Sequence, residues 1–133
     1  TKSEKLQQYY GDRIVGLADA TKLSQNPQYS SKWDLVLVNL PHRTIEFLPT
    51  LIPLLNRNNV SLIRGRVIVA ESDIPSANEK INQILPNIAA GKPKPELKIK
   101  RDYSSTLRLC SFEAWIEKDT QQYYELNDFV GII

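Results

Sequence analysis

The sequence predicts an α/β protein, in which a mainly parallel sheet that ends in an antiparallel hairpin forms a three-layer sandwich with helices. Continuous apolar runs at residues 33–40 and 66–71 are typical of strands covered on both faces. Residues 45–56 and 76–85 carry apolar side chains at helical spacing, whereas residues 96–117 alternate. Right-handed connections between such elements give a layered α/β fold.

Composition fits one domain spanning residues 1–133, with residues 118–133 as a tail. The 133 residues, 41% hydrophobic and 24% charged, are ordinary for a globular chain and exclude disorder. One cysteine excludes an internal disulfide, which predicts a reducing, cytoplasmic location. With one histidine the chain has no zinc-ligand set, so no metal is expected, and no apolar run is long enough to cross a membrane. The net charge of +2 alone does not establish a nucleic-acid partner.

The first third of the chain is predicted to form a helix, two strands and a loop. Residues 3–10 predict a short polar helix closed by Gly11. Residues 13–18 predict a buried strand, and residues 20–29 a loop or one helical turn. The strongest pattern is the run at residues 33–40, which we expect to be a central strand, buried on both faces, that ends at Pro41 because proline cannot donate to a strand ladder.

The remaining elements alternate helix and strand before the hairpin. Thr44 is a candidate cap for the helix of residues 45–56, in which two prolines predict a kink or an early break. Ser76 is the corresponding cap for residues 76–85. Residues 96–103 and 106–117 form the predicted edge hairpin, and the tail is expected to dock on the core or pair with a neighbour.

Polar residues follow two of the predicted strands. In open α/β sheets ligands bind at the carboxyl ends of strands, where Asp19-Ala20 and Asn39-Leu40-Pro41-His42 lie. The amide of Asn39 offers a donor and an acceptor, which match the edge of a purine, and Pro41 stiffens the turn. The alternatives are structural: Asn39 closes a turn, and Asp19 caps one.

The segment Asn39-Leu40-Pro41-His42, with the apolar strand before it and Glu46-Phe47-Leu48 after it, resembles the fourth motif of a methyltransferase group. These are class I S-adenosylmethionine (AdoMet) enzymes of the tRNA (guanine-37) and wybutosine-synthesis type. Residues 99–104 and 109–112 resemble the closing hairpin of that group, and the resemblance spans about residues 13–116. It implies a Rossmann-like fold that transfers a methyl group from AdoMet to a base nitrogen of RNA, with tRNA as the expected substrate.

The resemblance also implies residue roles. Asn39 would hold the target base, with Pro41 orienting it, and Asp19 and Ala20 would contact the adenine of the cofactor. The expected substrate-binding residues are His42, Arg43, Lys98 and Lys100. The structural alternatives are that His42 is a solvated loop histidine and that the two lysines belong to a charged edge strand.

One feature of the group has no counterpart in this sequence. Its first strand ends in a glycine-rich turn that cradles the methionine part of the cofactor, and no two of the five glycines are close enough to form one. The chain therefore resembles a partial Rossmann-like domain, the C-terminal half of the fold. We expect the chain alone to bind AdoMet weakly or not at all, and to act as an enzyme only when another chain or domain supplies the N-terminal half. The alternative is a non-catalytic interaction or scaffold domain that has lost the cofactor site.

Overall fold

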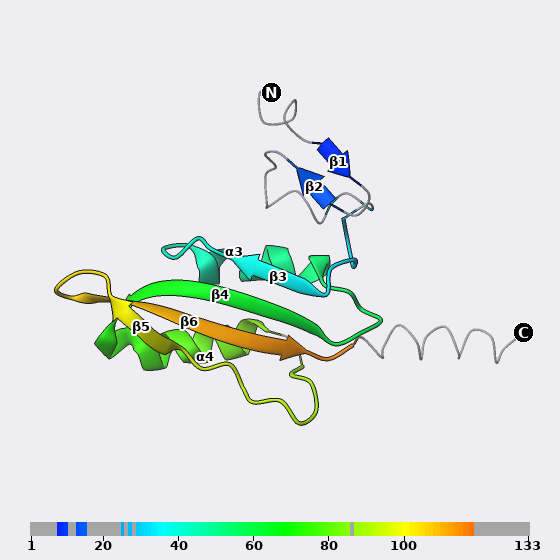
Figure 1. Ribbon diagram of the computed structural model, residues 1–133. Coiled ribbons are helices and arrows are strands. Elements are labelled where there is room, and N and C mark those ends of the chain that lie inside the picture. The colour runs from blue at the N-terminus through cyan, green and yellow to red at the C-terminus, as the bar shows by residue number, and fades with distance from the viewer. Residues whose placement is uncertain are drawn as a thin grey trace, which may run out of the picture.

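The computed structural model describes residues 8–10, 13–15, 25, 27, 29–85 and 87–118. Its main sheet has the strand order β3-β4-β6-β5, with β3 parallel to β4 and the other two pairings antiparallel (Figure 1). The strands are β3 (Leu35–Val38), β4 (Ser61–Ala70), β5 (Lys98–Asp102) and β6 (Leu107–Ile116). The helices are α3 (Thr44–Leu51) and α4 (Ile74–Ile84), with 3₁₀ turns η1 (Ile52–Leu54) and η2 (Glu71–Asp73). The predicted α/β class and the closing hairpin are confirmed.

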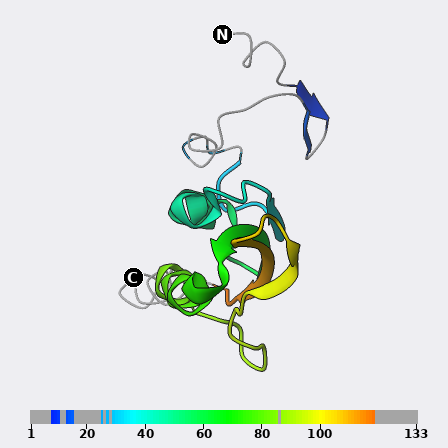
Figure 2. The ribbon, with the colours of Figure 1, turned by 90° about the vertical axis from the view of Figure 1, so that its left-hand side faces the viewer.

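Helices α3 and α4 lie on the same face of the main sheet (Figure 2). The alternation of buried and exposed positions along β4 shows why: its odd-numbered side chains enter the core, and Arg64 and Arg66 point away from it. The core side chains are Leu48, Leu51, Ile63, Val67, Ala77, Ile81, Cys110, Phe112 and Ala114. We call the opposite face, which carries Arg64, Arg66, Ser111 and Glu113, the open face, because no described helix covers it.

Strand β3 is not central in the described sheet. It pairs only with β4 among the described strands, and Leu35 and Leu37 are 46% and 67% exposed. The prediction of a strand covered on both faces is therefore wrong for these residues. A continuous apolar run reports that both faces of a strand are apolar, but it does not report whether a neighbour covers them.

The helices follow the predicted apolar spacing with shifted ends. Helix α3 gives way after Leu51 to η1, which has Pro53 in its first turn, so the predicted early break is confirmed. Thr44 is the first helical residue rather than a side-chain cap, and α4 begins at Ile74, two residues before the predicted cap Ser76. Strand β4 begins at Ser61, ahead of the predicted residue 66, because its pairing with β6 extends through Arg64 and Gly65.

The described N-terminal residues form a two-stranded antiparallel ribbon. Strand β1 (Gln8–Tyr10) pairs with β2 (Arg13–Val15), so the helix predicted over residues 3–10 is wrong for residues 8–10. The two tyrosines of β1 favour extended backbone, and pairing with β2 satisfies its amide groups. The remainder of the strand predicted over residues 13–18 and the tail beyond residue 118 lie outside the described residues.

Candidate functional site

The turn that follows β3 is fixed to β4 by hydrogen bonds. The Ile68 N–H donates to the Pro41 carbonyl at 3.0 Å, and the Arg43 N–H donates to the Leu40 carbonyl at 2.7 Å. The buried Thr44 hydroxyl lies 2.7 Å from the Arg66 carbonyl and 3.0 Å from the Leu40 carbonyl. The turn therefore provides hydrogen-bond partners for backbone groups of β4 at positions beyond the last residue of β3. This gives Asn39 a defined place at the carboxyl end of β3.

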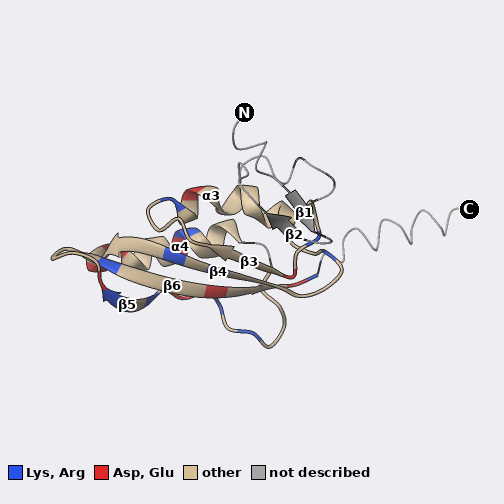
Figure 3. Cartoon of the chain, turned by 45° about the horizontal axis from the view of Figure 1, so that its top comes forward, with Lys and Arg blue, Asp and Glu red and all other residues tan. Residues whose placement is uncertain are grey.

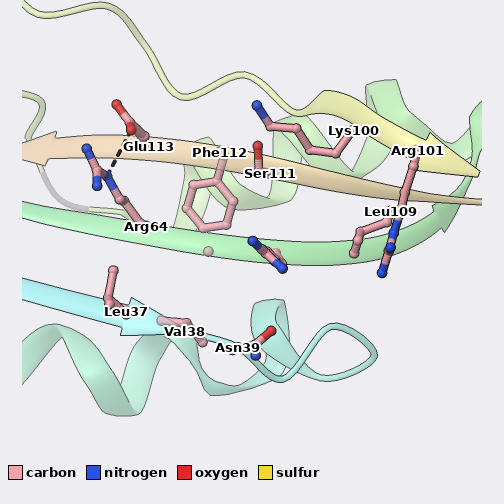
Figure 4. A pocket seen from close by; sticks show the side chains of 12 residues that line it. Leu37, Val38, Asn39, Arg64, Lys100, Arg101, Leu109, Ser111, Phe112 and Glu113 are labelled. Carbon is pink, nitrogen blue, oxygen red and sulfur yellow. Dashed lines mark ion pairs between the residues drawn. The ribbon is translucent and has the colours of Figure 1, made fainter. Parts of the chain in front are cut away.

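Asn39 lines a pocket on the open face of the sheet, together with side chains from four strands (Figure 4). The pocket has a volume of about 850 Å³. The Asn39 side chain is exposed and forms no hydrogen bond with the described residues. The described lining residues are Leu37, Val38, Asn39, Arg64, Gly65, Arg66, Lys100, Arg101, Leu109, Ser111, Phe112 and Glu113.

The pocket carries more positive than negative charge. Glu113, the only carboxylate among the described lining residues, forms an ion pair with Arg64 at 2.9 Å between Oε1 and Nε, and both side chains are half exposed. Arg66, Lys100 and Arg101 also line the pocket, and none of them has a carboxylate partner within the described part of the chain. Three positive charges therefore remain available to an anion. We call this site the cationic pocket.

The strand register brings these residues together from distant parts of the sequence. Arg66 on β4 pairs with Ser111, and Arg101 on β5 pairs with Leu109, two residues away on the intervening strand β6. Figure 3 shows charged positions side by side across these strands. Arg64, Arg66, Arg101 and Ser111 were not among the predicted site residues. Arg64 and Arg66 lie about thirty residues before the hairpin in the sequence. Predicted pairing between the two strands is the feature that could have identified them.

A bulge in β5 separates the two lysines that strand alternation placed together. The register shifts between Ile99 and Arg101, so that Lys98 opposes Ser111 and Arg101 opposes Leu109. Lys100 is the extra residue of the bulge and lines the cationic pocket with Arg101, whereas Lys98 is not one of the lining residues.

His42 and Arg43 make contacts outside the pocket lining. The His42 ring meets the Tyr103 ring edge-on, at 5.6 Å between centroids and 78° between planes, which connects the turn to the hairpin. Arg43 pairs with Glu46 at 3.1 Å and lies 4.5 Å from the centre of the Phe47 ring. The hydrogen bond from Arg43 lowers the pKa of the Glu46 carboxyl.

The described residues include no glycine-rich turn of the kind that cradles AdoMet. Asp19 and Ala20 lie outside them. A Cβ atom at Gly65 would come within 2.5 Å of Phe112 Cε1, so this glycine serves close packing in mid-strand. Gly91 has φ +80° in a loop with open space around it, and neither glycine follows a strand as a phosphate- or cofactor-binding turn would. No group of three metal-ligating side chains occurs among the described residues.

Comparison with solved structures gives an informative similarity. No family model and no curated protein matches the sequence. The crystal structure of M. jannaschii TYW2 in complex with AdoMet superposes with a TM-score of 0.56 and 18% sequence identity, over 77% of this chain and 44% of that chain. In the described part of this chain, no helix is long and apolar enough to span a membrane. The superposition shows that this chain has a partial Rossmann-like fold, similar to part of the TYW2 structure.

Proposed function

We propose that this chain is the RNA-binding part of an AdoMet-dependent methyltransferase that modifies a base nitrogen of RNA, with tRNA as the substrate class. The observation that carries the proposal is the position of Asn39. Its unpaired amide lies at the carboxyl end of β3, within a pocket that has three available positive charges. Ligands of open α/β sheets bind at this end of the strands.

The chemistry of the cationic pocket suits a nucleotide. The Asn39 amide donates and accepts hydrogen bonds, as recognition of a base edge requires. Arg66, Lys100 and Arg101 suit the phosphates that flank an exposed base. His42 and Lys98 are further proposed contacts, whereas the pairing of Arg43 with Glu46 leaves Arg43 less available.

In this proposal the described residues bind the RNA and do not bind the methyl donor. These residues include no glycine-rich turn at a strand end, so cofactor contacts must come from elsewhere, with Asp19 and Ala20 as the proposed adenine contacts. We also propose a cytoplasmic location, which the free thiol of Cys110 supports because no disulfide forms.

The test is the binding of fluorescently labelled tRNA to the 133-residue chain, measured by anisotropy over a range of salt concentrations. Replacing Arg66 and Arg101 with glutamine should lower affinity. It should also reduce the slope of log K against log salt by about 1.5, since each phosphate contact contributes about 0.7–0.9. The matched control is the Lys80→Gln/Lys118→Gln variant, which loses the same charge at exposed positions outside the pocket lining.

The outcome separates two functions. A loss of affinity confined to the Arg66/Arg101 variant supports an RNA site in the cationic pocket. An equal loss in both variants would show that binding depends only on overall charge. No measurable binding by the unmodified chain would favour a non-catalytic scaffold domain.

A further inference from the structure

An exposed aromatic ring lies just beyond one end of the cationic pocket. Arg101, which lines the pocket, pairs with Leu109 of β6. Two residues further along the chain, the Tyr103 N–H donates to the Leu107 carbonyl at 3.0 Å, which continues the same antiparallel pairing. Because side chains alternate along a strand, Tyr103 points to the open face, as Arg101 does. Tyr103 is 52% exposed, and within residues 29–85 and 87–118 it is the only exposed Phe, Tyr or Trp side chain.

The backbone on either side of Tyr103 is anchored by Arg108. Its guanidinium lies 3.3 Å from the Asp102 carboxylate and 3.8 Å from the Glu71 carboxylate, and it donates to the Ser104 carbonyl at 3.4 Å. Both chain neighbours of Tyr103 therefore contact one arginine that is itself only 22% exposed. The tyrosine has a defined place in the hairpin while its ring remains in solvent.

The Tyr103 ring is also held from the other side of the sheet. His42 follows Pro41, whose carbonyl accepts from the Ile68 N–H of β4. Figure 1 shows the turn after β3 and the loop of the β5–β6 hairpin at the same end of the main sheet. The contact between the His42 and Tyr103 rings therefore spans β4 and β6 at that end. An edge-on contact leaves most of the tyrosine ring uncovered, in agreement with its exposure.

An exposed and oriented ring beside a group of cations is the arrangement that binds single-stranded nucleic acid. The cations contact the phosphates, and unpaired bases stack on the aromatic ring. Two residues of a strand span about 7 Å, so a nucleotide whose phosphate meets Arg101 can bring its base to Tyr103. Asn39 and Tyr103 approach the open face from opposite sides, with β4 and β6 between them, so the two side chains suit two successive bases.

We infer that Tyr103, with its ring held against His42, is a stacking surface for an unpaired RNA base next to the base that Asn39 holds. This inference rests on the proposed function, which it extends by a base contact beyond the pocket lining. Stacking does not depend on the identity of the base, because every base has an aromatic face. Tyr103 therefore adds affinity for single-stranded RNA without selecting its sequence.

The first test measures binding of labelled tRNA to the 133-residue chain by anisotropy. Tyr103→Leu should weaken binding roughly 5- to 150-fold, which is the usual contribution of one stacked base. Tyr103→Phe should keep the affinity, because stacking needs the ring and not the hydroxyl. The matched control is Ile99→Ala, which removes an apolar side chain of β5 that is 45% exposed and pairs with the core residue Cys110. Equal affinities of the Tyr103→Leu variant and the unmodified chain would overturn the inference.

The second test detects stacking directly with a Tyr103→Trp variant. Saturating tRNA should quench the fluorescence of this variant more than that of the unmodified chain, which already contains Trp33 and Trp115. The rival role of Tyr103 is structural, in which its contact with His42 only joins the turn to the hairpin. Equal quenching in the two proteins, together with a lowered melting temperature of Tyr103→Leu, would establish that role and overturn the inference.

The salt dependence of binding separates this inference from the proposed function. Tyr103→Leu should leave the slope of log K against log salt unchanged, because no phosphate contact is lost, whereas the Arg66/Arg101 variant should reduce it. Binding that depends on Arg66 and Arg101 but not on Tyr103 would overturn only the stacking surface. Binding that depends on Tyr103 but not on the two arginines would overturn only the phosphate contacts of the cationic pocket. Absence of tRNA binding would overturn both.

Discussion

Replacing Thr44 with valine should destabilise the protein by removing one buried hydroxyl. Valine keeps the shape of threonine, and Thr44 is 1% exposed. The hydroxyl carries a single proton and lies 2.7 Å from the Arg66 carbonyl and 3.0 Å from the Leu40 carbonyl. The Leu40 carbonyl also accepts from the Arg43 N–H, so the loss falls mainly on the Arg66 carbonyl. Leaving a buried acceptor unsatisfied costs about 1–3 kcal/mol.

The measurement is urea unfolding followed by circular dichroism, with Thr44→Ser as the control. Serine keeps the hydroxyl and loses only the methyl group that packs near Gly65, which costs about 1 kcal/mol. A loss of 1–3 kcal/mol lowers the melting temperature by roughly 4–12 °C in a chain of this size. The Thr44→Val variant should also bind tRNA more weakly, because the turn that positions Asn39 loses its attachment to β4.

Two results would refute this reasoning. A Thr44→Val variant as stable as the unmodified protein would show that the hydroxyl does not hold the turn. A Thr44→Ser variant destabilised more than Thr44→Val would show that packing of the Thr44 methyl group, which valine retains, contributes more to stability than the hydroxyl does.

Three further predictions concern single groups. In a complete enzyme, Asn39→Ala should lower the rate of single-turnover tRNA methylation on the order of 100-fold and leave the melting temperature unchanged. A normal rate with a lowered melting temperature would show that Asn39 only closes the turn. Burial raises the pKa of the Cys110 thiol, so a thiol reagent at pH 8 should label the folded protein slowly and the urea-unfolded protein rapidly; rapid labelling of the folded protein would contradict this. Arg43 lowers the pKa of the Glu46 carboxyl from 4.5. The attraction between the two side chains is therefore complete above pH 4.5 and is lost as the pH falls through the lowered pKa. An NMR titration of Glu46 should show the lowered pKa, and Arg43→Gln should return it toward 4.5.

Local patterns in the sequence were sufficient for the elements that depend on local geometry. The apolar spacing of α3 and α4 predicts which residues enter the core, such as Leu48 and Ile81, because a helix repeats every 3.6 residues. The prolines predict the break after Leu51, and alternation predicts the hairpin of β5 and β6. The position of Asn39 at the end of a strand also follows from sequence, because Pro41 ends the ladder.

The composition of the pocket and the place of β3 in the sheet depend on contacts between distant residues. Arg66 and Arg101 line one pocket because β4 and β5 both pair with β6 in a particular register, and no local pattern encodes that register. The bulge that turns Arg101 toward Leu109 is also a property of the pair of strands. The apolar residues of β3 show only that both of its faces are apolar. Whether a face is covered depends on which strands and helices lie beside it, and only the tertiary structure shows that Leu35 and Leu37 are exposed.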